Sequence, residues 1–195
     1  MTRKSRADAA RNRQHIVTVA RAAFADEGLD LPMREIARRA CVGVATLYRH
    51  FPTRTDLVTA ALTEHVAACR ADMRAALDDP DAWGALSGTI RRFAERQVRE
   101  RGLNQALFGS HAASAAFAED RRAQSAGLAQ LVERARQAGA VRGDVTLEDV
   151  RVGLAAIASF RPLRPERPAA STQRLVALLL AGLRPVPDHK RPAGT

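Results

Sequence analysis

The chain has 195 residues, of which 46% are hydrophobic and 27% are charged, so it is long enough to bury a core and too apolar to be a disordered polymer. Its formal net charge is +10 at pH 7, from 31 Lys and Arg against 21 Asp and Glu, which favours a polyanionic partner. Because Lys4 and Lys190 are its only lysines and alanine is abundant, part of this excess reflects a bias toward arginine codons. The placement of the charges is therefore more informative than their sum.

Basic side chains gather at the N-terminus. Residues 1–13 contain five basic side chains and one acidic side chain, namely Arg3, Lys4, Arg6, Arg11 and Arg13 against Asp8. A basic arm ahead of a first helix can follow the DNA backbone or enter a minor groove. A solvated terminus without a partner is the alternative, and the sequence leaves both open.

No pattern in the sequence indicates a metal site, a disulfide or a membrane segment. Cys41 and Cys69 have no Cys or His nearby at metal-ligand spacing, so we expect neither a disulfide nor a zinc site. The longest apolar run, residues 175–183, is far too short to span a bilayer, and no apolar segment of a secretory signal follows the basic N-terminus. We expect a cytoplasmic protein without a cofactor.

Apolar residues recur at helical spacing along the whole chain, and sustained two-residue alternation is missing. The pattern predicts an all-α fold. The first helix is expected from about Ala9 to Glu27, with Gly28 as its stop.

Residues 31–51 are predicted to form two short helices joined by a tight turn. The apolar positions of the first helix are Ile36, Ala37 and Ala40. Residues 41–43 interrupt the pattern, Leu47 faces inward on the second helix, and the side chains left to face outward are Thr46, Tyr48, Arg49 and His50. This arrangement is typical of helix-turn-helix units, which place the second helix in a DNA major groove. An ordinary helical hairpin has the same apolar spacing, but the polar outer face favours DNA binding.

This stretch resembles the DNA-binding domain of TetR-family transcriptional regulators, over about residues 13–62. The resemblance is carried by the Ile36-Ala37 pair, by the Leu-Tyr-x-His-Phe box of residues 47–51, and by Arg54. It implies an N-terminal three-helix helix-turn-helix domain and a C-terminal helical bundle for ligand binding and dimerisation. The expected bounds are residues 9–55 and 56–184, with flexible tails at 1–8 and 185–195.

The resemblance also implies roles for individual residues. The start of the second motif helix would touch base edges, neighbouring side chains would contact phosphates, and Arg34 is the best candidate for a guanine contact. The expected DNA-binding residues are Arg34, Val44, Ala45, Thr46, Tyr48, Arg49, His50 and Arg54. The alternatives are that Tyr48 packs on the following helix and that His50 only bonds a helix end.

Two positions depart from the family pattern. Cys41 stands where a glycine is usual in the turn, and it would cost about 1 kcal/mol if the backbone needs a positive φ there. Pro32 and Met33 stand where many relatives have a Ser or Thr cap, so a hydroxyl contact with a phosphate is expected to be lost.

Capping patterns and breaks divide the rest of the chain. Capping boxes at residues 53–56 and 146–149 are expected to open helices, and Asp78-Asp79-Pro80 is expected to combine an acidic cap with a proline at a first helical position. The helix opened by the first capping box is expected to end at about Leu77. Further helices are expected at about residues 83–97, 103–109, 114–137, 147–158 and 171–183.

The last predicted helix is apolar on too many sides for the surface of a monomer. It indicates a homodimer interface, made with the small residues of the preceding helix. A helix fully buried within one chain is the alternative.

The sequence contains no phosphate-binding glycine loop and no hydrolase or metalloprotease motif, so an enzyme is not expected. The favoured function is a ligand-responsive repressor that binds a palindromic double-stranded DNA operator as a homodimer. A small α-helical enzyme and a nonspecific architectural DNA-binding protein are the alternatives. The effector is expected to be an apolar or aromatic molecule in a pocket lined by Met73, Trp83, Phe93, Gln97, Asn104, Phe108, His111, Phe117 and Leu128.

Overall fold

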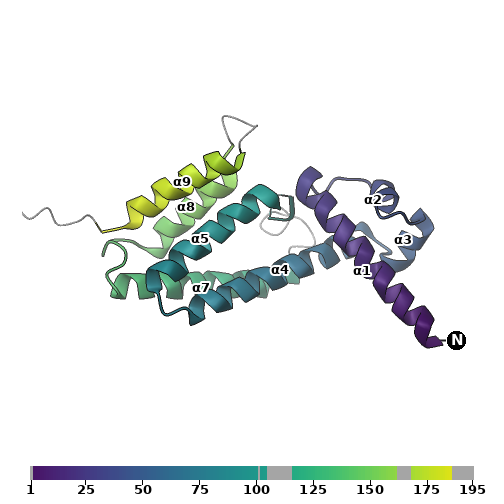
Figure 1. Ribbon diagram of the computed structural model, residues 1–195, viewed down its shortest axis with the longest axis horizontal. Helices are drawn as coiled ribbons and strands as arrows, with labels where there is room; N and C mark the ends of the chain where they lie inside the picture. Colours follow the sequence, from purple (N-terminus) through teal and green to yellow (C-terminus); the bar gives the residue numbers. More distant parts are fainter. Residues whose placement is uncertain (1, 101, 105–115, 162–167, 186–195) are drawn as a thin grey trace, which may run out of the picture. The chain divides into compact units, whose positions relative to one another are not determined.

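The computed structural model describes residues 2–100, 102–104, 116–161 and 168–185, and these residues form helices joined by turns, with no strand among them (Figure 1). The predicted all-α fold is confirmed. The helices are α1 (Thr2–Glu27), α2 (Met33–Arg39), α3 (Val44–His50), α4 (Arg54–Asp78), α5 (Ala82–Arg99), α7 (Ala118–Gln137), α8 (Leu147–Ser159) and α9 (Pro168–Leu183). Most of the helix predicted at residues 103–109 lies outside the described residues.

The chain packs as two compact units. The first consists of residues 1–71 and 96–124, and the second of residues 72–95 and 125–195, within the described ranges. Helices α4, α5 and α7 each contribute residues to both units. The domain bounds drawn from the sequence, 9–55 and 56–184, stay a prediction.

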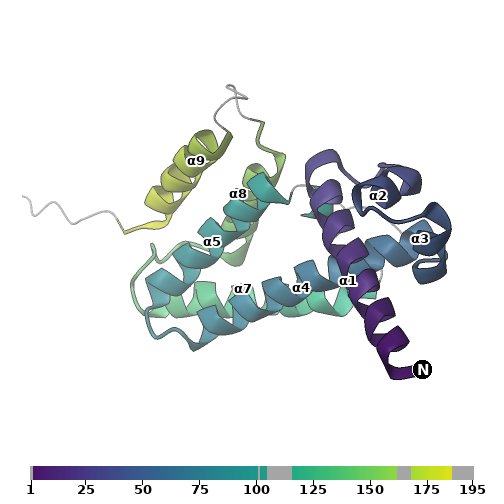
Figure 2. The same ribbon diagram turned by 45° about the vertical axis from the view of Figure 1, so that its right-hand side comes forward.

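In the first unit, α1 and the first part of α4 cross and support the two short motif helices (Figure 2). The side chains that join these helices are almost fully buried, and they include Phe24, Ile36, Leu47, Phe51 and Leu57. Burial of such a side chain stabilises a fold by about 1.5–3 kcal/mol. The short helices α2 and α3 therefore depend on tertiary packing, because seven residues are too few for an isolated helix.

Helix α1 begins at Thr2 and not at about Ala9, so the segment expected to be a flexible basic tail is helical from residue 2. The physical reason is that residues 2–8 contain neither glycine nor proline. A hydrogen bond from Arg11 to Asp8, one turn apart, adds local support. The helix ends at the predicted stop, where Gly28 has φ +82°.

The turn between α2 and α3 has the positive φ at Cys41 that the sequence analysis treated as a condition for strain. Cys41 has φ 53°, and it is the single residue other than glycine with a positive φ in the described ranges. Its N–H donates to Arg38 O (3.1 Å) and the N–H of Val42 donates to Ala37 O (3.0 Å), which ends α2. At the other end of α2, Pro32 provides no side-chain cap, as expected.

Both predicted capping boxes are confirmed. Asp56 Oδ2 accepts from the N–H of Thr53 (2.9 Å) and the N–H of Asp56 donates to Thr53 Oγ1 (3.1 Å), and Thr146 and Asp149 form the same pair at the start of α8. The assignment of Pro80 to a first helical position is wrong. Asp81 caps α5 instead, because its Oδ1 accepts from the N–H of Trp83 (3.0 Å) and the helix begins one residue after it.

The second unit has its own apolar core, contributed by α5, α7, α8 and α9 and by the end of α4. Arginine side chains satisfy the free carbonyl groups of two helix ends. Arg134 donates to Leu77 O (2.8 Å) at the end of α4, and Arg142 donates to Gly182 O (2.7 Å) at the end of α9. These bonds supply partners that the helix itself cannot provide.

Helix α9 is buried along one side only. Val176 and Leu180 are buried, whereas Leu178 is 60% exposed, and Val152 on α8 is also 60% exposed. The alternative of a final helix fully buried within the chain is therefore wrong. The sequence is apolar on both sides of the helix, and the fold covers one of them.

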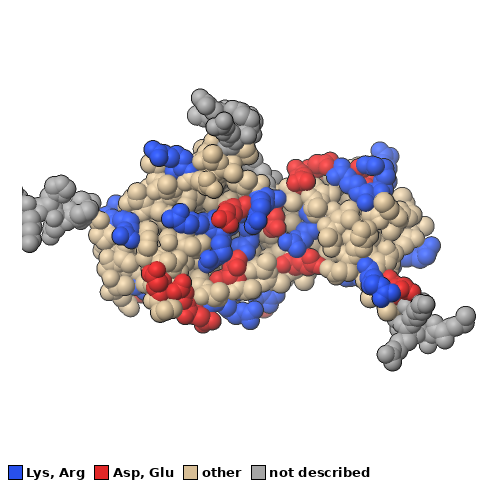
Figure 3. All heavy atoms as spheres, in the orientation of Figure 1, with Lys and Arg blue, Asp and Glu red and all other residues tan. Residues whose placement is uncertain are grey.

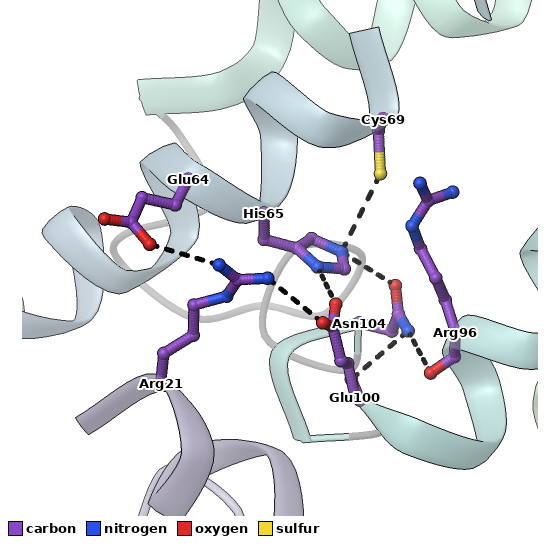
Figure 4. Close-up of polar contacts among 7 residues, drawn as sticks. All are labelled: Arg21, Glu64, His65, Cys69, Arg96, Glu100 and Asn104. Atoms are coloured by element: carbon purple, nitrogen blue, oxygen red, sulfur yellow. Dashed lines mark hydrogen bonds and ion pairs between the residues drawn. The ribbon is translucent and has the colours of Figure 1, made fainter. Parts of the chain in front are cut away.

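A polar network in the first unit joins α1, α4 and the residues that follow α5 (Figure 4). Arg21 on α1 donates to Glu64 Oε2 and to Glu100 Oε1, each at 3.1 Å. Nδ1 of the fully buried His65 lies 2.6 Å from Glu100 Oε2, and Nε2 lies 3.1 Å from Asn104 Oδ1. The Asn104 amide group in turn donates to Arg96 O and Glu100 O, each at 3.2 Å.

Burial and hydrogen bonding act in opposite directions on the pKa of each group, and the pKa values of His65 and Glu100 are both lowered. Burial lowers the pKa of His65, because loss of water disfavours the imidazolium, although Glu100 and Asn104 oppose that shift. Partial burial alone would raise the pKa of Glu100, but the hydrogen bond with His65 and the nearby Arg21 guanidinium outweigh it and lower the pKa. Glu100 is therefore held as a carboxylate.

The chain after α5 also approaches the end of α1 closely. A Cβ atom added at Gly102 would lie 1.9 Å from Phe24 O and 2.9 Å from the Cα of Gly28. Only glycine fits at this contact. The polar network and this backbone contact together hold residue 100 and residues 102–104 against the helix that supports the motif.

Glu100→Gln is expected to lower the free energy of unfolding by about 1–2 kcal/mol, because Arg21 and His65 lose a charged acceptor. The difference between wild type and variant should depend on pH. Since folding lowers the pKa of Glu100, its stabilisation is present above the ordinary value of 4.5 and is lost as the pH falls through the lowered value. Urea titrations from pH 7 to pH 3 measure this. Glu95→Gln, at an exposed position of the preceding helix α5, is the control, and an equal loss in both variants would contradict the assignment.

Cys41→Gly is expected to raise the free energy of unfolding by up to about 1 kcal/mol, because glycine adopts φ 53° without strain. Cys41→Ala removes the thiol and keeps the Cβ atom, so it should give no such gain. Chemical denaturation of the three proteins under reducing conditions provides the comparison. A gain in the alanine variant equal to that in the glycine variant would place the cost in the thiol and not in the backbone.

Candidate nucleic-acid interface

Helix α3 presents one side to solvent. Leu47 is fully buried, whereas Val44 is 42% exposed and Tyr48 is 46% exposed. Ala45 and Arg49 are also exposed, and Thr46 and His50 are half-buried. Tyr48 is therefore not part of the buried core, and its role in DNA binding stays a prediction.

The basic residues of α2 differ in how far they are neutralised. Glu35 accepts from Arg38 Nε (2.8 Å) and from Arg39 Nε (2.8 Å), and Arg39 also pairs with Glu27 at 2.5 Å. The hydrogen bonds from Arg38 and then Arg39 lower the pKa of Glu35 to about 2. Arg34 is exposed and makes no ion pair within the described part of the chain. Arg34 is therefore the cation of α2 that is available to a ligand.

Further cations lie around α3. Nη2 of Arg54, at the start of α4, is buried and has no hydrogen-bond partner among the described residues. The guanidinium group of Arg13 lies 4.8 Å from the centre of the Phe51 ring, directly after α3. His50 also lies beside this ring, with 6.5 Å between ring centres.

On the face seen in Figure 3, basic side chains gather over α2, and others lie near α3 and along the exposed part of α1. The surface around α3 thus combines cations with the exposed side chains of Val44, Ala45 and Tyr48. This combination can bind a polyanion by charge and contact its other surfaces by shape.

The predicted pocket residues are divided between the two units. Met73, Trp83, Phe93 and Leu128 belong to the apolar core of the second unit. Asn104 is buried and hydrogen-bonds His65 in the first unit. Phe117 belongs to the apolar core of that unit. Gln97 belongs to the same unit and is not part of its core. Phe108 and His111 lie outside the described residues. The pocket stays a prediction.

The sequence analysis missed the residues that neutralise charge across the fold. It assigned no partner to Arg21, Glu35 or Glu100, because two of these three pair with residues far away in the chain. It also overlooked that His65 lies one helical turn before Cys69, whose Sγ is 3.9 Å from Nε2 of the histidine. Among the residues that the structure describes, no three His, Cys, Asp or Glu side chains are placed to hold a metal ion. No helix in those ranges is long and apolar enough to cross a membrane.

Two family models match the chain. Residues 16–61 match the N-terminal model of bacterial regulatory proteins of the tetR family, and residues 79–185 match the C-terminal domain of SbtR-like transcriptional regulators. An HTH-type transcriptional regulator of Staphylococcus aureus (strain USA300) is 43% identical over 53 residues, which are 27% of this chain and 29% of that protein. The chain thus aligns with less than a third of this curated relative.

Solved structures match over nearly the full length. A TetR transcription regulatory protein from Mycobacterium vanbaalenii is 35% identical, with 92% of this chain and 99% of that chain covered and a TM-score of 0.64. A TetR transcriptional regulator from Streptomyces coelicolor is also 35% identical, with coverages of 89% and 99% and a TM-score of 0.64. The exposed second motif helix and these matches lead to one conclusion: the chain belongs to the TetR family of transcriptional regulators.

Proposed function

We propose that this regulator is a ligand-responsive repressor that binds a palindromic operator in double-stranded DNA as a homodimer. The observation that carries the proposal is the exposed side of α3, flanked by cations that the fold leaves available. A location in the cytoplasm, where the DNA lies, is part of this proposal, and a catalytic activity is not.

The DNA-binding role rests on the difference between paired and unpaired arginines around α3. Arg34 is an exposed cation without an ion pair in the described residues, and Arg54 has one buried nitrogen without a hydrogen-bond partner there, whereas Arg38 and Arg39 pair with Glu35 and Glu27. The exposed residues of α3 would enter the major groove. The proposed DNA-contacting set remains Arg34, Val44, Ala45, Thr46, Tyr48, Arg49, His50 and Arg54.

The homodimer rests on the exposed apolar side of the last two helices. Their exposed residues include Val152, Ala155, Ala156, Ala177, Leu178 and Ala181. A Cβ atom at Gly153 would lie 3.6 Å from Leu179 Cδ2, so α8 and α9 pack closely and present one continuous surface. A second copy of the same surface would cover it, and the dimer would place two recognition helices about 34 Å apart.

The effector site is proposed for the apolar core of the second unit. A Cβ atom at Gly127 on α7 would lie 2.7 Å from Met73 Cγ on α4, so the flexible thioether side chain fills this contact. An apolar or aromatic molecule could take its place if Met73 changes rotamer. Such an effector releases DNA only if it binds the DNA-free form more tightly.

Arg54→Ala is expected to weaken binding to all DNA sequences alike and to reduce the slope of log affinity against log salt by about 1, because one phosphate contact is lost. Thr46→Ala is expected to weaken binding to a preferred duplex and to leave binding to random duplex unchanged. Fluorescence anisotropy measures both, with a duplex enriched from a random library by the full chain.

Arg99→Ala removes an exposed arginine at the end of α5 and serves as the matched control for the salt slope. If Arg99→Ala changes the salt slope as much as Arg54→Ala does, Arg54 contributes only through the net charge of the protein and not through a phosphate contact. Failure of the wild-type chain to enrich any duplex would contradict the proposed function itself.

Leu178→Glu is expected to convert the dimer to monomers, because it places a charge in the proposed apolar interface. Val98→Glu changes an exposed valine of α5 to the same residue and should leave the dimer intact. Sedimentation velocity at micromolar concentration compares the three proteins. A monomeric wild type, or an intact dimer of the Leu178 variant, contradicts the interface.

A further inference from the structure

The exposed apolar side chains of this protein are few and unevenly placed. In the described part of the chain, the large hydrophobic residues classed as exposed are Val44, Tyr48, Val98, Val152 and Leu178. Val152 and Leu178 belong to the proposed dimer surface. Two of the remaining three lie on α3, which has only seven residues. Exposed apolar side chains that gather on one short element indicate a binding surface.

The exposed residues of α3 form a strip. Tyr48 lies four residues after Val44 and three after Ala45, so the three side chains are neighbours on the helix surface. The fold does not need this strip for packing, because the fully buried Leu47 anchors α3 to the core. The apolar character of the strip is therefore available for recognition.

The first turn of α3 has little capacity for polar recognition. Val44 and Ala45 carry neither donors nor acceptors in their side chains, and Thr46 is half-buried. The nearby Arg38 and Arg39 are occupied by Glu35 and Glu27. Hydrogen bonds to base edges from this turn are consequently scarce.

The floor of the DNA major groove offers one apolar group, the 5-methyl group of thymine. We propose that the strip of Val44, Ala45 and Tyr48 reads thymine 5-methyl groups, so that each operator half-site carries thymine where it faces Val44. This inference rests on the proposed function and names the chemical group that the site recognises. It places the sequence preference of the protein mainly in methyl contacts and not in hydrogen bonds.

Thymine and uracil test the inference directly, because they differ only by this methyl group and pair identically with adenine. The full chain is first used to enrich a duplex from a random library that contains thymine. The enriched duplex is then prepared with uracil in place of single thymines, and the affinities are compared. Wild type should bind about fourfold less tightly for each methyl group that it contacts, which corresponds to the loss of one buried carbon group.

Val44→Ala identifies the residue that makes the contact. At the thymine facing Val44, this variant should bind the thymine and uracil duplexes with nearly equal affinity, and its affinity for the uracil duplex should match that of wild type. The variant should fold, since Val44 is exposed and alanine is a good helix former. Val98→Ala makes the same change at an exposed site of α5 and should keep the full thymine preference.

Three outcomes decide the matter. A thymine preference in wild type that is lost in Val44→Ala and kept in Val98→Ala supports the inference. Equal affinity of wild type for every thymine and uracil pair overturns it, and so does a preference that Val44→Ala retains at every position. Failure to enrich any duplex is a different result, because it rejects the proposed function before the methyl groups are tested.

Discussion

The hydrogen-bonded network of Arg21, His65 and Glu100 is the interaction on which the arrangement of the first unit depends. It joins α1, α4 and the residues after α5, where the Glu100 carboxylate lies next to the buried His65 ring. Helices α1 and α4 together support the two short motif helices, which cannot be stable alone. Any change in the angle between α1 and α4 would therefore move α3. The network and the close contact at Gly102 restrict that angle.

Charge pairing also decides which arginines can act. The chain has a large excess of arginine, yet two of the three arginines on α2 pair with two carboxylates, Arg38 with Glu35 and Arg39 with Glu35 and Glu27. Two cations near α3 differ from these. Arg34 is exposed, and Arg54 has one buried nitrogen without a hydrogen-bond partner in the described residues. In the proposed function, pairing with internal carboxylates would limit nonspecific attraction to DNA, and the exposed apolar side chains of α3 would contribute to discrimination between sequences.

Local signals predicted the fold well. The two capping boxes, the stop at Gly28 and the strained turn at Cys41 involve residues within about four positions of one another, so the sequence contains everything that they require. The start of α1 was wrong because a basic segment was taken for a tail, although nothing in it stops a helix. The cap of α5 was assigned to the acids before Pro80, whereas Asp81, directly after it, is the cap. The turn decides which of these three aspartates lies at the helix start.

The sequence by itself determined the all-α class, the helix-turn-helix unit and the family, because apolar spacing, caps and a compact motif are properties of short segments. Tertiary structure alone decided which charges are cancelled, since Arg21 meets Glu100 from 79 residues away and His65 meets it from 35. It also decided that Leu178 and Tyr48 are exposed while Leu47 and Val176 are buried, although all four are large side chains on helices with strong apolar character. The physical reason is that burial and ion pairing are set by neighbours brought together in space, and a helix pattern specifies its own faces without specifying what will cover them.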